Sequence, residues 1–188
     1  YCLIFEDGTP LTELRNKGYL KEVDDDTELE QYQLVRALLD EQGYRHYEIS
    51  NYARPGRECR HNLLYWGPGE YLGFGPSAHS HWQGVRYGNI RNLDEYNRRM
   101  LAGQSVRQFE ERLTPEAKAR EALVMYLRRL GGVSREEFRT STGFDYQTLC
   151  ADQIAWLNQI GMVEVSDDRL KLTAQGIFVS DAVFAELV

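Results

Sequence analysis

The most distinctive part of the chain is the run Arg60-His61-Asn62-Leu63-Leu64-Tyr65-Trp66, followed by Gly-Phe-Gly-Pro-Ser-Ala-His-Ser at residues 73–80. Pro55-Gly56 precedes the run and Gly67-Pro68-Gly69 follows it. Because these residues break regular structure, the run is expected to form a short isolated turn of helix or an ordered loop. If it is helical, His61 and Tyr65 share a face, since residues four apart are neighbours on a helix surface.

This run crowds a metal-capable imidazole against large aromatic side chains. The neutral imidazole of His61 can bind haem iron as an axial ligand, and Tyr65 and Trp66 offer broad apolar faces for a porphyrin. Asn62 can fix the local backbone or the imidazole by hydrogen bonding. These four residues are the candidate cofactor-binding residues, with His61 as the metal ligand. A histidine beside aromatic residues can equally be a hydrogen-bonded structural residue, and both interpretations stay open.

The neighbouring residues leave further alternatives. Cys59-x-His61 and His79-x-His81 supply four possible zinc ligands, although their spacing is narrower than that of usual zinc sites. The glycines between residues 67 and 75 allow close approach of either a ligand or a second backbone. A strand here would place His79 and His81 on one side. The basic residues Arg54, Arg57 and Arg60 suit porphyrin propionates or form a solvated positive face.

Upstream, strand and helix signals alternate. The sequence predicts a short buried strand over residues 2–5, a brief helix over 11–17, a helix over 26–41 with acidic residues at its start, and a strand over 44–49 after Gly43. The order strand, helix, strand is that of an α/β unit.

Downstream, residues 104–112 are expected to form a polar linker to a second domain. Thr114-Pro115 begins a helix, Ser134-x-x-Glu137 is a capping box, and Asp145 can cap a third helix that extends to Gly161. Residues 162–165 and 169–172 alternate around Asp167-Asp168, which predicts a hairpin, and 174–187 predicts a final helix.

Three helices and a hairpin form a winged-helix-like plan, so a DNA-binding module is one functional alternative. The third helix, over residues 145–160, has two Asp and no Lys or Arg, and the hairpin tip is also acidic. A DNA-reading wing needs cations to meet phosphates, so nucleic acid is not an expected partner. The formal net charge of -7 points the same way.

Composition is ordinary for a globular protein, with 42% hydrophobic and 27% charged residues. No apolar run approaches the roughly 18 residues that span a bilayer, and no signal-peptide pattern is found, so a cytoplasmic location is expected. The chain has three scattered cysteines, which predicts reduced thiols rather than a disulfide framework.

Four motifs carry a family resemblance: Tyr47-Glu48-Ile49-Ser50-Asn51-Tyr52-Ala53-Arg54-Pro55-Gly56, Cys59-x-His61-Asn62-x-x-Tyr65-Trp66, Gly69-Glu70-Tyr71-Leu72-Gly73-Phe74-Gly75, and Ala78-His79-Ser80. The chain resembles the HemW-type radical SAM haem chaperones, often labelled oxygen-independent coproporphyrinogen III oxidase-like after their relative HemN. The HNxxYW element is the most specific part of the resemblance, which extends more loosely over the whole chain. In that family the motif's histidine is implicated in haem binding, which corresponds to His61 here.

The resemblance implies the end of a radical SAM partial β/α barrel over residues 1–103, the linker 104–112, and a winged-helix-like α+β domain over 113–188. It implies a chaperone that binds haem and delivers it to apo-haem proteins, with anaerobic coproporphyrinogen III oxidation in porphyrin biosynthesis as the alternative. Family members also bind a [4Fe-4S] cluster and S-adenosylmethionine through Cys-x-x-x-Cys-x-x-Cys. Cys2, Cys59 and Cys150 lie too far apart for that motif. A C-terminal fragment without catalytic residues is therefore expected.

Overall fold

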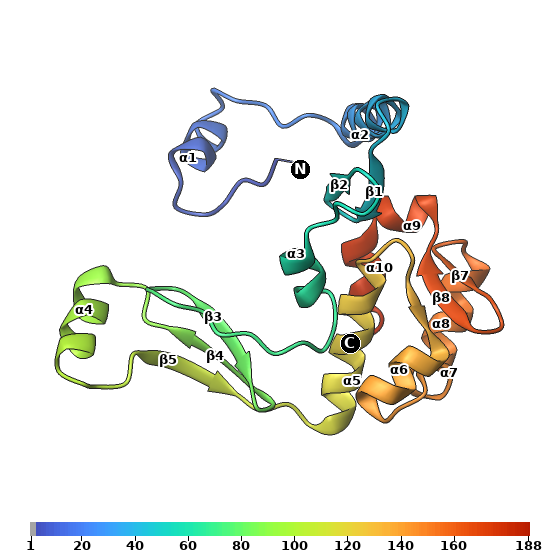
Figure 1. The fold of residues 1–188 in the computed structure, drawn as a ribbon. Coiled ribbons are helices and arrows are strands. Elements are labelled where there is room, and N and C mark those ends of the chain that lie inside the picture. The colour runs from blue at the N-terminus through green and yellow to red at the C-terminus, as the bar shows by residue number, and fades with distance from the viewer. Residues whose placement is uncertain (1–2) are drawn as a thin grey trace. The chain divides into compact units, whose positions relative to one another are not determined.

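The computed structural model describes residues 3–188, and it divides into two compact units, one ending at Glu58 and one beginning at Cys59. Figure 1 shows the elements of both units in chain order. Within the described residues, no helix is both long and apolar enough to cross a membrane.

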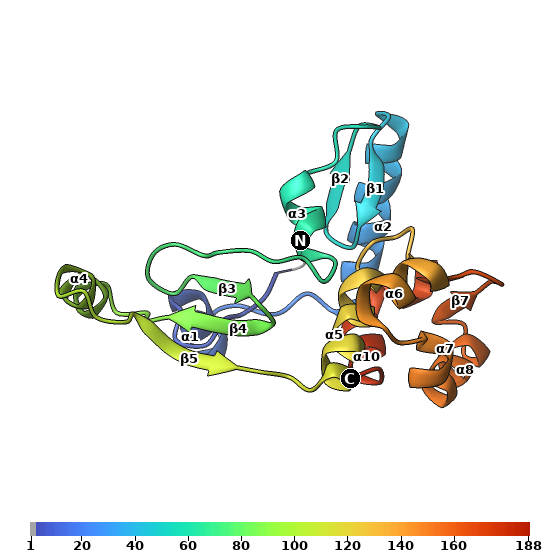
Figure 2. The same ribbon diagram turned by 60° about the horizontal axis from the view of Figure 1, so that its bottom comes forward.

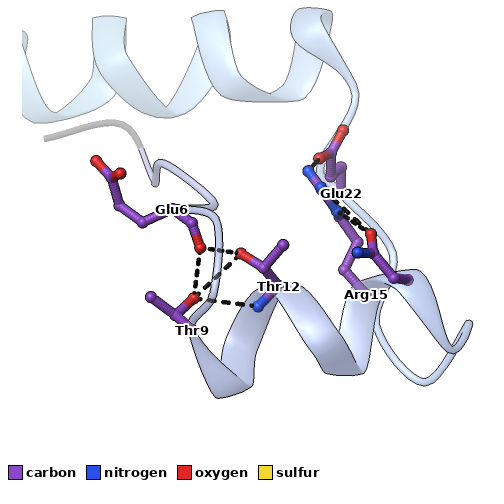
Figure 3. Close-up of polar contacts among 6 residues, drawn as sticks. Glu6, Thr9, Thr12, Arg15 and Glu22 are labelled. Carbon is purple, nitrogen blue, oxygen red and sulfur yellow. Dashed lines mark hydrogen bonds and ion pairs between the residues drawn. The ribbon is translucent and has the colours of Figure 1, made fainter.

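The first unit contains the helices α1 (Pro10–Asn16) and α2 (Asp25–Glu41) and the strands β1 (Arg45–Glu48) and β2 (Asn51–Ala53). Both helices begin at side-chain caps. The Thr9 hydroxyl accepts a hydrogen bond from the Thr12 backbone N–H at 3.3 Å and donates one to the Glu6 carbonyl at 2.8 Å (Figure 3). Asp24 accepts from the Thr27 N–H at 2.9 Å. The predicted helices over 11–17 and 26–41 are thus confirmed.

After α2, Gly43 adopts a left-handed conformation with φ 77°, which ends the helix, and β1 and β2 form an antiparallel hairpin. The predicted strand over 44–49 is confirmed. The predicted strand over 2–5 is wrong for residues 3–5, which have no regular structure, and Leu3 and Ile4 are 64% and 72% exposed. A strand is stabilised by a paired neighbour, and no strand among the described residues pairs with this segment. Cys2 lies outside the described residues.

The second unit begins with α3 (Arg60–Tyr65) and continues into a three-stranded antiparallel sheet. The sheet has the order β3 (His79–Trp82), β4 (Val85–Asn89), β5 (Arg107–Glu111), and α4 (Leu93–Leu101) connects β4 to β5. Figure 2 shows the three strands side by side, with α4 beyond their far end.

The predicted polar linker over 104–112 is wrong for Arg107–Glu111, which pair with β4 as β5. The sequence of β5 lacks the alternation of a half-buried strand, and most of its side chains are exposed, so its pairing with β4 decides that it is a strand. The compact units also separate after residue 58 rather than near 103. The physical reason is that the sheet extends to residue 111 and is joined to the next helix by the ion pair between Arg86 and Glu121.

The rest of the second unit has the order of a winged helix. It contains α5 (Pro115–Leu127), β6 (Val133–Ser134), α6 (Arg135–Thr142), α7 (Tyr146–Leu149), α8 (Ala151–Gln159), β7 (Val163–Val165), β8 (Arg169–Leu172), α9 (Ala174–Phe178) and α10 (Ser180–Ala185). The strands form an antiparallel sheet of order β6-β8-β7. The predicted caps Thr114, Ser134 and Asp145 each accept a backbone N–H, and the predicted hairpin is β7–β8. The predicted helices over 145–161 and 174–187 are each interrupted, at Cys150 and at Val179.

The core of the described chain is concentrated in these elements. Fully buried side chains include Leu123 and Leu127 from α5, Phe138 from α6, Tyr146 from α7 and Leu170 from β8. The rings of Tyr126, Phe138 and Tyr146 meet edge to face, with centroids 6.4 Å and 5.6 Å apart. This packed core holds α5 in place, and α5 forms one wall of the site described next.

Candidate functional site

The helix α3 presents His61 and Tyr65 together. Their rings meet edge to face with centroids 4.9 Å apart, and the Tyr65 hydroxyl lies 3.2 Å from His61 Nε2. The imidazole is exposed, while Tyr65 is half-buried. The predicted shared helix face is confirmed, and an exposed imidazole is paired with a phenol that can orient it.

Aromatic contacts continue from Tyr65 into the sheet. The Tyr65 and Tyr71 rings are 4.6 Å apart, and the Tyr71 and His81 rings are 6.4 Å apart. Two backbone hydrogen bonds join Tyr71 to His81, and His81 Nδ1 donates to the Gly69 carbonyl at 3.0 Å. Because a carbonyl only accepts, Nδ1 of His81 carries the proton, and Nε2 keeps its lone pair when the ring is neutral.

Tyr65 lines a cavity of about 350 Å³ that lies between the loop after α3, the sheet and α5. Its wall is mostly apolar, a character typical of small-molecule pockets. Aromatic side chains, apolar side chains, two basic and two acidic side chains line it: Tyr65, Trp66, Tyr71, His81, Leu113, Ala122, Met125, Arg86, Lys118, Glu111 and Glu121.

Trp66 fixes the end of α3 against α5. The Arg128 guanidinium lies over the Trp66 ring, 4.4 Å from its centroid, and a Cβ added at Gly67 would lie 3.5 Å from the Tyr126 ring. Asn62 is half-buried, and its backbone carbonyl accepts the Trp66 N–H at 3.3 Å. Among the four predicted site residues, Tyr65 and Trp66 line the cavity, whereas His61 and Asn62 lie outside its wall.

The two basic side chains of the cavity wall differ in their partners. Arg86 on β4 pairs with Glu111 on β5 and with Glu121 on α5, the latter at 3.2 Å. Hydrogen bonding to Glu111 is the main reason that the pKa of Arg86 is raised. Lys118 forms no ion pair within 4.0 Å among residues 3–188. Burial raises the pKa of the Tyr71 hydroxyl, with the nearby Tyr65 adding to the effect, so this hydroxyl stays a neutral donor at physiological pH.

In the glycine-rich segment after α3, Gly73 lets the backbone pass close to a second stretch of chain. A Cβ at Gly73 would lie 2.1 Å from the His79 carbonyl oxygen, and the Gly73 N–H donates to the Ser80 hydroxyl at 2.9 Å. The close chain crossing is therefore the interpretation that holds at Gly73.

The zinc alternative finds no support in the geometry. Over residues 3–188, no group of three or more His, Cys, Asp or Glu side chains lies close enough to hold a metal ion. Cys59 is exposed and Cys150 is buried, with its thiol 3.8 Å from the Leu187 carbonyl. The described residues therefore do not fit a [4Fe-4S] cluster either, because such a cluster needs several thiolates together.

Sequence reasoning missed the cavity and its charged residues. Arg86 is separated from Glu111 by 25 positions and from Glu121 by 35, and all three are common surface residue types. Only the aromatic side of the cavity had a local signal, in Tyr65 and Trp66 of the HNxxYW element and in the spacing of His79 and His81.

The family described as "HemN C-terminal domain" matches residues 113–179. The haem chaperone HemW of Lactococcus lactis is 30% identical over 188 residues, covering 100% of this chain and 49% of that protein. The haem chaperone HemW of Mycobacterium tuberculosis is 34% identical over 190 residues, covering 100% and 46%. The mitochondrial radical S-adenosyl methionine domain-containing protein 1 of Bos taurus is 32% identical, covering 100% and 45%. The chain thus spans about half the length of the curated relatives it matches.

Among solved structures, coproporphyrinogen III oxidase (HemN) from Escherichia coli, a radical SAM enzyme, matches with a TM-score of 0.71. The match covers 88% of this chain and 42% of that chain, at 19% identity. At this identity the likeness shows the fold. It confirms the expected fold class, the end of a radical SAM α/β barrel with a small α+β domain after it.

Proposed function

Because this chain is similar over its whole length to HemW-type radical SAM haem chaperones, we propose that it is the haem-binding part of a haem chaperone, with His61 as the iron ligand. Its whole length matches haem chaperones at 30% and 34% identity. In the proposal, the longer protein transfers the haem to apo-haem proteins in the cytoplasm. The [4Fe-4S] cluster and S-adenosylmethionine of such a protein would be bound by residues other than those described here.

The observation that carries the proposal is the exposed imidazole of His61 on an aromatic surface. Haem iron takes a neutral imidazole nitrogen, and porphyrin faces pack well on Tyr and Trp rings. Tyr65 lies within hydrogen-bonding distance of His61 Nε2, so the phenol restrains the imidazole. Trp66 fixes the helix end through Arg128. Asn62 supports the same helix by its backbone, which any residue type could do.

The contact between His61 and Tyr65 also restricts how iron can bind. Where the Tyr65 hydroxyl donates to Nε2, the lone pair of that atom is engaged, so coordination there requires the hydroxyl to move away. His61 is exposed, so a ligand can reach the ring without unfolding the helix.

Two alternatives receive less support. Coproporphyrinogen III oxidation is supported by a structural likeness at 19% identity and by the HemN C-terminal domain match over residues 113–179, whereas the relatives at 30% and 34% over the whole chain are named haem chaperones. A winged-helix nucleic-acid module has the right topology. However, α8 carries no Lys or Arg, and the β7–β8 turn contains Asp167 and Asp168.

The test is an anaerobic haem titration followed by absorption spectroscopy, with His61→Ala and the matched control His79→Ala. His79 is another exposed histidine, whose ring lies 5.3 Å from that of Phe109. We expect saturable binding with a shifted Soret band that His61→Ala removes and His79→Ala keeps. A full-length HemW-type relative carrying the equivalent histidine substitution would be titrated in parallel. Haem binding that survives the loss of this histidine in both proteins rejects it as the ligand, and absence of binding in both rejects the proposed function.

A further inference from the structure

The cavity that Tyr65 lines has a wall suited to a planar, largely apolar molecule. Tyr65, Trp66 and Tyr71 supply aromatic surface, and Met125 supplies a flexible apolar side chain that adapts to irregular shapes. Its volume of about 350 Å³ lies at the lower end of the range of roughly 300–1,000 Å³ for ligand pockets. The cavity therefore suits one edge of a large ring system rather than the whole ring.

The charges of the wall indicate which kind of edge fits. Arg86 is already neutralised, because Glu111 and Glu121 both contact its guanidinium. Lys118 is half-buried on α5, and a Cβ added at Gly84 would lie 3.7 Å from its Nζ, so the ammonium lies against the β3–β4 turn. Within residues 3–188, no carboxylate lies within 4.0 Å of Lys118. A carboxylate on the ligand would offset the cost of holding this charge away from water.

Tyr65 connects the cavity to the proposed iron ligand. Its hydroxyl contacts His61, and its side chain also lines the cavity. A porphyrin whose iron is near His61 can therefore extend an edge past Tyr65 into the cavity.

We propose that this cavity takes a propionate-bearing edge of the porphyrin, with the Lys118 ammonium as the counter-charge and the Tyr71 hydroxyl as a neutral donor to the carboxylate. The inference rests on the proposed haem-binding function and names the residues that recognise the carboxylates. Lys118 has no part in binding the iron, so its effect is separable from that of His61.

The experiment compares haem with haem dimethyl ester, in which both propionates are esterified. Each is titrated into the chain and into Lys118→Gln, with Lys21→Gln as the control, because Lys21 is an exposed lysine of the other unit. We expect Lys118→Gln to weaken haem binding about 5- to 20-fold and to leave the ester within about twofold, since only the free acid provides the charged hydrogen bond. Lys21→Gln should change neither.

Further measurements separate charge from folding. Lys118→Arg keeps the cation and should retain haem affinity within about threefold. Raising the salt concentration should weaken haem binding to the wild-type chain more than to Lys118→Gln. Far-UV circular dichroism checks that each variant folds. Equal losses for haem and its ester, or no loss for either, overturn the proposal. If His61-dependent binding persists unchanged in Lys118→Gln, only the inference on Lys118 fails. If the wild-type chain and the full-length relative do not bind haem at all, the proposed function fails.

Discussion

The winged-helix part of the chain and residues 3–58 use apolar residues in opposite ways. Phe138 and Leu127 are completely buried in the former. In contrast, α2 has 17 residues and none of them is buried, although Leu34, Val35 and Leu38 recur at helical spacing. Both regions have helices with side-chain caps, so the strength of the local helix signals does not explain the difference in burial. It shows that an amphipathic pattern forms a helix, whereas burial depends on what packs against it.

Core substitutions should separate the two regions most strongly. Phe138→Ala removes a fully buried ring that contacts Tyr126 and Tyr146, and we expect it to lower the free energy of unfolding by about 3–5 kcal/mol. Leu38→Ala on α2, where the side chain is 51% exposed, should cost less than about 1 kcal/mol. Denaturant unfolding followed by circular dichroism measures both. Similar losses in the two variants would show that residues 3–58 have a core of comparable importance.

Glycine substitutions give the next largest expected contrast. Gly132 has φ 62°, and a Cβ there would lie 2.0 Å from the Leu170 carbonyl oxygen, so Gly132→Ala must displace β8 and should cost more than about 2 kcal/mol. Gly43 has φ 77° with open space around it, so Gly43→Ala carries only the left-handed penalty of about 1–2 kcal/mol. Thermal unfolding of both variants tests this order. An equal shift would mean that β8 moves aside easily.

The smallest contrast concerns two helix-capping aspartates. Arg135 and Arg139 pair with Asp145, and hydrogen bonding from Arg135 is the main cause of its lowered pKa. A lowered pKa means that the stabilisation is complete above the unfolded-state value of about 3.9 and is lost as pH falls through the folded-state pKa. Asp145→Asn should therefore cost about 1 kcal/mol near neutral pH, and the two stability curves should converge below about pH 4.

Asp24 provides the matched control. Its pKa is also lowered, mainly by the Thr27 N–H, but it is exposed and has no arginine partner among the ion pairs of residues 3–188. Asn caps helices as well as Asp does, so Asp24→Asn should cost little near neutral pH and should remove only the acid dependence that comes from the Thr27 hydrogen bond, which we expect to be smaller than that of Asp145 with its two arginine partners. If Asp24→Asn changes the loss of unfolding free energy at low pH as much as Asp145→Asn does, the arginine pairs are not the source of that pH dependence.

The sequence by itself determined the features whose partners lie a few residues away. Asp24, Thr114, Ser134 and Asp145 each accept a backbone N–H within three positions, so the caps could be predicted. The same holds for the short β7–β8 hairpin and for the face that His61 and Tyr65 share on α3. It also holds for the family resemblance, which depends on the HNxxYW element. These features require no knowledge of distant segments, because their hydrogen bonds close short loops.

Only the tertiary structure decided the features that join distant segments. Arg107–Glu111 reads as a polar linker and becomes a strand by pairing with β4, while residues 3–5 read as a strand and lack a partner. The cavity brings Tyr65, Arg86 and Lys118 together from a helix, a strand and a second helix. Its wall combines residues of the sheet and of α5, and the ion pairs of Arg86 join these segments across 25 and 35 positions. Such contacts arise when the chain closes long loops, and no local pattern records which segments meet.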